Sequence, residues 1–186
     1  VLNIVNGSGH NAGELIVKNK NIKAISFTGG TYTGKHIYQN SFDSFKKLSL
    51  EMGGKNPAII FKDCDLASTI KGVIKSSFTN QGQICLCSSR ILIQDSIFEK
   101  FKTKFCNDIL DLTVGDPKEN KTQFGSISSK SQYEKIKSYI DFAKRENGTI
   151  LIGGRVKKLK GRCKNGWFIE PTVICLLYTS PSPRDQ

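Results

Sequence analysis

Hydrophobic residues along the chain recur with two different spacings, and these spacings predict the elements of the fold. Apolar positions three or four residues apart predict helices in the segments 12–18, 34–40, 66–78, 98–109 and 133–143. Short apolar runs bounded by turn residues predict strands at 1–5, 24–27, 47–50, 58–61, 90–94, around 150 and at 168–174. Strands that alternate with helices imply an α/β architecture with a largely parallel sheet.

Two features refine the predicted helices. Asp65 directly precedes the apolar positions of segment 66–78, so we expect its side chain to cap that helix. Phe98, Phe101 and Phe105 share one helical face with Ile109. An aromatic stripe at this spacing is typical of a buried core, so we do not assign it to ligand binding. The hydrophilic stretch 116–122 is the expected linker.

Composition and charge bear on the class of protein. Hydrophobic residues make up 38% of the chain and charged residues 24%, and no apolar run reaches membrane-spanning length, so we expect a soluble, cytoplasmic protein. The net charge of +12 raises the question of a nucleic-acid partner. The lysines are spread along the chain, with one modest cluster at 157–164 and no nucleic-acid-binding motif. A basic solvated surface is therefore preferred, whereas a nucleic-acid-binding module would show steeply salt-dependent binding.

The cysteines do not form an obvious metal or disulfide framework. The chain has six of them, at positions 64, 85, 87, 106, 163 and 175, without any Cys-x-x-Cys pair. The only histidines are His10 and His36. This spacing is a poor match to a zinc site, and the chain is not a short cysteine-dense secreted framework. We expect no metal and reduced thiols in the cytosol.

The two ends of the sequence differ from the middle. The chain opens on the strand-like VLNIV without an initiator methionine, so we expect its natural beginning to be missing. From Cys175 to Gln186 the sequence becomes CLLYTSPSPRDQ, which has no apolar periodicity and resembles a translated sequencing adapter. We interpret 175–186 as a non-native tail and exclude it from the functional argument.

Two glycine-rich stretches predict turns that can bind an anion. In FTGGTYTGKHI, residues 27–37, a strand ends, two glycines turn the backbone and Gly34 opens a helix. NGSGHNAG, residues 6–13, repeats the theme upstream. Backbone N–H groups at a helix start favour phosphate. Neither stretch has the full dinucleotide fingerprint, so each alone is better read as an ordinary turn, and only together do they favour a nucleotide.

A carboxylate and a thiol follow these turns. Glu51 stands at the end of an apolar strand before two glycines, where partial desolvation would raise its pKa toward that of a general base; the alternative is an exposed carboxylate beside Lys55. Cys85 lies between Gly82 and a strand, where a sharp loop can present sulfur and backbone N–H to a carbonyl. Cys87 would point to the same side if the segment were extended. Without context, both cysteines are better read as small buried residues.

The order and wording of these motifs resemble the aldehyde dehydrogenase superfamily over residues 1–174. The matching segments are ISFTGG-x-x-x-G, KKLSLEMGGKNPAIIF, D-x-D-L, SSFTNQGQICLCSSRI, VGDP and GWFIEPTV. The phrases KKLSLE, GGKNPAIIF and ICLC are similar to the branch that oxidises 2-aminomuconic semialdehyde in tryptophan breakdown and related muconic semialdehydes.

This resemblance implies a role for each matching residue. Cys85 corresponds to the catalytic nucleophile and Glu51 to the general base, with Met52 near the nicotinamide of NAD. Five glycines correspond to the coenzyme-contacting turns, namely Gly9, Gly13, Gly29, Gly30 and Gly34. The family usually has serine at position 30, and glycine removes a hydroxyl that can bond the pyrophosphate. Weaker NAD binding would follow.

The resemblance also implies a mechanism and an architecture. A thiolate at Cys85 adds to an aldehyde, hydride passes to NAD, and Glu51 activates water to release the acid from a thioester. Residues 1–50 would be the end of a Rossmann-type coenzyme domain and 51–174 part of an α/β catalytic domain. The whole protein would be a homo-oligomer, dimer or tetramer, and this piece alone inactive and poorly folded. A catalytically silent family member and an acyl transfer to coenzyme A are the alternatives.

Overall fold

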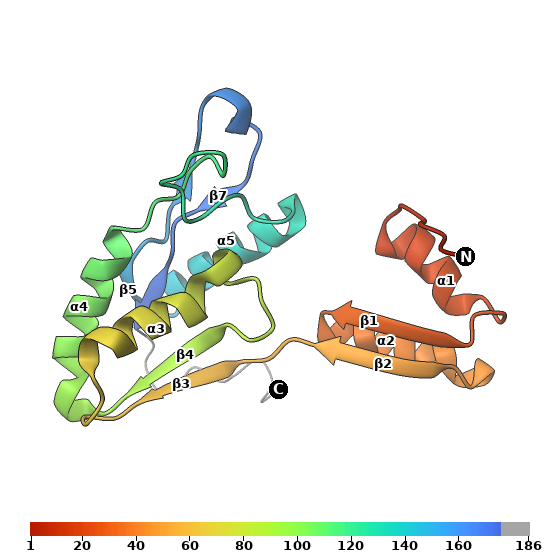
Figure 1. The fold of residues 1–186 in the computed structure, drawn as a ribbon, viewed down its shortest axis with the longest axis horizontal. Helices are drawn as coiled ribbons and strands as arrows, with labels where there is room; N and C mark the ends of the chain where they lie inside the picture. The colour runs from red at the N-terminus through yellow and green to blue at the C-terminus, as the bar shows by residue number, and fades with distance from the viewer. Residues whose placement is uncertain (176–186) are drawn as a thin grey trace. The chain divides into compact units, whose positions relative to one another are not determined.

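The computed structural model describes residues 1–175 and divides the chain into two compact units, Val1–Gly54 and a second unit that begins at Lys55. We describe each unit by itself (Figure 1). The elements of the first unit are η1 (Gly9–Gly13), α1 (Glu14–Lys18), β1 (Ala24–Gly29), α2 (Thr31–Ser41), η2 (Phe42–Ser44) and β2 (Lys47–Met52). Those of the second are β3 (Asn56–Ile60), α3 (Leu66–Phe78), η3 (Thr79–Gly82), β4 (Ser88–Ile93), η4 (Asp95–Ile97), α4 (Phe98–Leu110), α5 (Lys130–Arg145), β5 (Thr149–Ile152), β6 (Val156–Lys157), η5 (Gly161–Cys163), β7 (Phe168–Ile169) and β8 (Val173–Cys175).

The first unit is built on one parallel pair of strands joined by a helix. Strands β1 and β2 pair in parallel from Ala24 opposite Lys47 to Gly29 opposite Met52, and α2 is the crossover between them (Figure 1). Alternate residues of β1, including Ile25 and Phe27, are half-buried, whereas their neighbours in sequence are exposed. This period-2 pattern is that of a strand covered on one face.

Polar contacts join α1 and the loop after it to the rest of the first unit. The imidazole Nε2 of His36 in α2 lies 2.6 Å from a carboxylate oxygen of Glu14, and Lys18 lies 2.8 Å from the same carboxylate. Hydrogen bonds from Lys18 and then from His36 lower the pKa of Glu14. Lys46 is buried and donates from Nζ to the carbonyl oxygens of Asn19 and Ile22, at 2.5 and 2.7 Å. The loop that follows α1 is thereby attached to the start of β2.

The second unit begins with another parallel pair of strands joined by a helix. Strands β3 and β4 pair in parallel, with Ala58 opposite Ile91 and a register shift after Asn56. Figure 1 shows α3 and α4 packed together beside this pair. The principal core consists of Ile60, Ile70, Val73, Phe101, Phe105 and Ile109. Phe101, Phe105 and Ile109 of the expected aromatic stripe are therefore core, whereas Phe98 is half-buried and lies outside this cluster.

Asp65 caps α3 as its position in the sequence predicts. Its carboxylate accepts a hydrogen bond of 2.7 Å from the backbone N–H of Ser68. Hydrogen bonds from Ser68 lower the pKa of Asp65. The cap stabilises the first turn of the helix that leads to the cysteine segment.

The α/β class is confirmed, but the expectation of a largely parallel sheet is wrong. Among residues 1–175 there are four two-stranded sheets; β1–β2 and β3–β4 are parallel, and β5–β8 and β6–β7 are antiparallel. The predicted strand at 168–174 is two strands, β7 and β8, with Glu170–Thr172 between them. Pro171 in that gap has no N–H to donate, so a continuous ladder is disfavoured there.

Two other local expectations are also wrong. Residues 1–5 form no strand, although their composition is strand-like, because no described strand pairs with them. The stretch 116–122 is a tied loop and not a free linker: Arg162 forms a two-pronged ion pair with Asp116, with both nitrogen–oxygen distances at 2.6 Å. This guanidinium holds the pKa of Asp116 well below its usual range.

The structure also bears on membrane crossing and on the first residue of the expected tail. Within residues 1–175, no helix combines the length and the apolar character needed to cross a membrane. Cys175, the first residue of the expected tail, is the last residue of β8 and pairs with Thr149, and the non-native origin of 175–186 stays a prediction. Residues 176–186 lie outside the described residues.

Candidate active site

The segment that carries Cys85 leaves α3 through three consecutive residues in the left-handed backbone region. Their φ angles are 50° for Asn80, 58° for Gln81 and 72° for Gly82. Asparagine and glycine adopt this conformation readily, whereas glutamine seldom does. The reversal separates the end of α3 from the start of β4 and places the cysteines between them.

The cysteines lie on a tight turn. The backbone N–H of Cys87 donates to the carbonyl oxygen of Ile84 at 3.0 Å and closes a turn over residues 84–87. Cys85 is exposed, and within residues 1–175 neither its thiol nor its N–H makes a hydrogen bond. The extended geometry that would point both thiols to one side is therefore wrong. Cys87 is half-buried, and its sulfur lies 3.6 Å from the carbonyl oxygen of Thr79.

Two amide side chains hold this turn. The Nδ2 of Asn56, at the start of β3, donates to the carbonyl oxygens of Cys85 at 2.7 Å and Cys87 at 3.2 Å. The Oε1 of Gln83 accepts from the backbone N–H of Ser128 at 3.1 Å. The loop is thus attached to β3 on one side and to the segment before α5 on the other.

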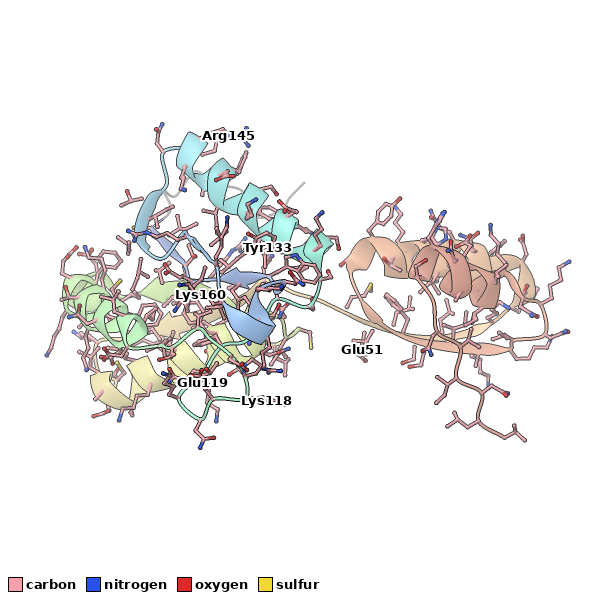
Figure 2. All side chains as sticks on the ribbon, turned by 90° about the horizontal axis from the view of Figure 1, so that it is seen from above. Glu51, Lys118, Glu119, Tyr133, Arg145 and Lys160 are labelled. Carbon is pink, nitrogen blue, oxygen red and sulfur yellow. The ribbon has the colours of Figure 1, made fainter. Side chains whose placement is uncertain are left out.

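Glu51 belongs to the first unit and lies next to the end of β2. Its partner across the sheet is Thr28, and both residues are exposed. Figure 2 shows Glu51 on the side of the strands away from the helices of this unit. Glu51 is exposed in this unit, and its role as general base stays a prediction. The convergence of Glu51 and Cys85 on one substrate stays a prediction, because they belong to different units.

The start of α2 offers unpaired N–H groups after the predicted glycine turn. The helix begins at Thr31, three residues before the expected start at Gly34. Gly30 is its N-cap residue and supplies no side-chain cap. The first three N–H groups of an α-helix have no partner within the helix, and the positive end of the helix dipole lies there. An anionic group can bind at this position.

The glycines at this turn are needed to different degrees. A Cβ atom at Gly34 would lie 2.6 Å from the Met52 sulfur, and one at Gly29 would lie 2.5 Å from the ring of Phe27. Both positions therefore require glycine or a shift of the neighbouring side chain. A Cβ at Gly30 would meet nothing within 4 Å. Gly9 and Gly13, which bound η1, also have open space around them.

Comparison with known proteins identifies the family. The family model described as the aldehyde dehydrogenase family matches residues 1–179. The chain belongs to the aldehyde dehydrogenase family.

Individual relatives agree with this assignment. The 2-aminomuconic semialdehyde dehydrogenase of Bos taurus is 46% identical over 176 residues, and the 2-aminomuconic 6-semialdehyde dehydrogenase of Pseudomonas sp is 41% identical over 175. Each match covers 94% of this chain and 36% of the relative. A crystal structure of betaine aldehyde dehydrogenase from Staphylococcus aureus, in complex with NAD+, superposes with a TM-score of 0.84 at 38% identity, over 90% of this chain and 34% of that one. The chain spans about a third of the length of these aldehyde dehydrogenases.

The structure adds residues to the site that the motifs did not single out. Asn56 and Gln83 both lie inside motifs of the family resemblance, yet neither was assigned a role. A signal existed for Asn56, because an amide side chain directly before a strand proline is able to bond neighbouring backbone. Among residues 1–175, no three His, Cys, Asp or Glu side chains lie close enough to hold a metal ion.

Proposed function

We propose that this chain is the part of an NAD-dependent aldehyde dehydrogenase that carries the nucleophile and the general base, and that the complete enzyme oxidises an aldehyde to its carboxylic acid. The observation that carries the proposal is the presentation of Cys85. An exposed thiol on a turn held by two side chains, with its own N–H unpaired among residues 1–175, has the two groups that addition to a carbonyl requires. Half-buried Cys87 lacks the exposure.

The chain's own residues carry the steps on the substrate. The Cys85 thiolate adds to the aldehyde carbon, and the oxygen that becomes an anion accepts a hydrogen bond from the Cys85 N–H. Loss of hydride from the same carbon leaves an acyl group on the Cys85 sulfur. Glu51 takes a proton from water, the resulting hydroxide attacks the thioester, and the acid leaves while the thiolate is restored. Release of the acid requires the Glu51 carboxylate and the Cys85 sulfur to face the same carbon.

The first unit supports a coenzyme role. The residues fit a dinucleotide because the uncapped start of α2 offers N–H groups to a phosphate and a Cβ at Gly30 would meet no neighbour. Gly29, Gly30 and Gly34 would hold the pyrophosphate, with Gly9 and Gly13 on the preceding turn and Met52 near the nicotinamide. NAD supplies the hydride acceptor when bound. We assign residues 1–50 to the coenzyme domain and 51–174 to the catalytic domain, so that Glu51, which lies in the last strand of the first compact unit, is counted with the catalytic residues.

The relatives suggest the class of aldehyde. Several are named for 2-aminomuconic semialdehyde, and one from Escherichia coli for 5-carboxymethyl-2-hydroxymuconate semialdehyde. We propose an unsaturated semialdehyde that carries a carboxylate, with 2-aminomuconic semialdehyde as the first candidate. The cytoplasmic location and the homo-oligomeric state stay predictions.

An assay of the complete enzyme tests this function. We expect NADH and the dicarboxylic product to form in equal amounts from 2-aminomuconic semialdehyde, with kcat/KM above that for acetaldehyde and betaine aldehyde. A better kcat/KM for either of the two other aldehydes would reject the substrate class. Absence of NADH formation with all of them would reject the dehydrogenase function itself.

Restoring a serine at position 30 is expected to strengthen NAD binding. Gly30 has φ −72° and ψ 146°, which any residue adopts, and the space around its Cβ position is open. The introduced hydroxyl adds one hydrogen bond toward the pyrophosphate, so Gly30→Ser should lower the Kd for NAD roughly 2- to 10-fold. Titration calorimetry on the complete enzyme measures this.

Gly72→Ser is the matched control for this change. Gly72 lies in α3, in the second unit, and a Cβ there also meets nothing within 4 Å. We expect Gly72→Ser to leave the Kd for NAD unchanged. An unchanged or higher Kd for Gly30→Ser would show that the start of α2 does not receive the pyrophosphate.

A further inference from the structure

Two hydrogen bonds fix the peptide groups on either side of Cys85. The conformation of a residue is set by the peptide groups on either side of it, since each is planar and trans. The peptide between Ile84 and Cys85 is fixed by the turn hydrogen bond from the Cys87 N–H to the Ile84 oxygen, 3.0 Å. The peptide after Cys85 is fixed by the Asn56 amide, which bonds the Cys85 oxygen at 2.7 Å.

The orientation of the Cys85 N–H follows from this arrangement. In a trans peptide, the carbonyl of one residue and the N–H of the next point in opposite directions. The Ile84 oxygen faces the interior of the turn, where it accepts from Cys87. The Cys85 N–H therefore points out of the turn, and it makes no hydrogen bond to any residue of 1–175. This is the donor that the oxyanion needs.

Asn56 is the side chain that keeps this arrangement. Its amide nitrogen donates to two carbonyl oxygens, that of Cys85 and that of Cys87, the latter at 3.2 Å. It stands at the start of β3, opposite Ser88 of β4 and directly before the register shift. Its side chain reaches the turn that precedes β4.

We propose that Asn56 is a positioning residue of the oxidation: by holding the carbonyl groups of Cys85 and Cys87, it keeps the Cys85 N–H directed outward beside the thiol. This inference rests on the proposed function and adds to it a residue that acts through the peptide groups of the nucleophile. Without the amide, the carbonyl groups of Cys85 and Cys87 lose their donor, so the peptides after these residues can rotate and the turn bond from the Cys87 N–H to the Ile84 oxygen is no longer held in place. The Cys85 N–H then loses its fixed direction and the oxyanion loses a prearranged donor, while the thiol stays exposed.

The turn exposes the Cys85 thiol and directs the Cys85 N–H, and these two roles can be measured separately on the complete enzyme. Addition of the thiol to an aldehyde creates an oxyanion, whereas alkylation of the same thiol by iodoacetamide does not. We expect Asn56→Ala to lower kcat about 10- to 100-fold, the size of effect that a misplaced reacting group produces. The rate of alkylation of Cys85 should stay within about threefold of the wild type, because the exposed sulfur needs no oxyanion donor for that reaction.

Asn56→Asp is the second variant, for use if the alanine variant does not fold. Aspartate has the same size but no amide donors, so Asn56→Asp should lower kcat toward the aldehyde in the same way.

Gln94→Ala is the matched control. Gln94 follows β4 and its side chain accepts from the Lys62 N–H at 2.8 Å, so it links the same two strands at their other end. We expect this variant to keep its kcat within about threefold of the wild type, since it leaves the turn untouched. If Asn56 only stabilised the fold, Asn56→Ala would lower kcat and the alkylation rate together. Equal losses of kcat in Asn56→Ala and Gln94→Ala would also indicate a merely structural role.

The outcomes separate the inference from the function on which it rests. A wild-type enzyme that fails to reduce NAD with any aldehyde overturns the proposed function and the role of Asn56 with it. An active wild type with unchanged kcat in Asn56→Ala or Asn56→Asp overturns only the positioning role. Loss of turnover with retained alkylation, and with the control unaffected, supports it.

Discussion

Replacing Cys85 with serine is expected to lower kcat of the complete enzyme at least about 1,000-fold, because a serine hydroxyl without an adjacent base is a far weaker nucleophile than a thiolate and every later step needs the thioester. The substitution changes one atom on an exposed turn, so folding and NAD affinity should persist. The measurement is the steady-state rate of NADH formation, together with the Kd for NAD. A loss of this size would also exclude a catalytically silent homologue, because such a protein has no turnover to lose.

Cys87→Ser is the control for the nucleophile assignment. The residue is two positions away on the same turn, but it is half-buried and its thiol lies against the Thr79 carbonyl oxygen. A hydroxyl can make the same contact, so we expect kcat within about threefold of the wild type. Equal losses in both variants, or retained turnover in Cys85→Ser, would contradict the assignment of Cys85.

Helix positions were predictable because they depend on local pattern. Leu66–Phe78 has apolar residues at helical spacing and a capping aspartate, and α3 has these bounds with Asp65 bonded to Ser68. Strand pairing depends on partners far along the chain, and here prediction was weaker. Residues 1–5 read as a strand but have no described partner, and the antiparallel pairing of β5 with β8 cannot be deduced from either segment alone.

The sequence proposes the identity of the site residues, which stays a prediction, but it does not give their geometry. The family motifs point to Cys85 and Glu51 directly. They do not show that Cys85 is exposed while Cys87 is half-buried, because that difference arises from the turn at 84–87 and not from composition. The role of Asn56 required coordinates as well, since its bonds reach 29 and 31 residues along the chain. Short-range pattern carries no information on contacts of that range.

Glu51→Gln is expected to separate hydride loss from release of the acid. Glutamine keeps the shape of the side chain but cannot accept a proton from water, so hydrolysis of the thioester should slow about 100- to 10,000-fold, the usual contribution of a general base. Formation of the thioester precedes that step and does not use the water. Each active site should therefore produce one NADH rapidly and then almost stop, which stopped-flow mixing of enzyme, NAD and aldehyde would record as a burst equal to the enzyme concentration.

The control for this prediction is an exposed glutamate that forms an ion pair on its own helix. Glu134 in α5 pairs with Lys137 at 3.1 Å, three residues on, and Glu134→Gln should leave both burst and steady-state rate unchanged. Normal steady-state turnover in Glu51→Gln would show that another group activates the water. Loss of the burst itself would place Glu51 before the thioester, as the base that removes the proton of Cys85. Because Glu51 and Cys85 belong to different units of the chain, only a burst followed by slow turnover supports their convergence on the same carbon in the order proposed.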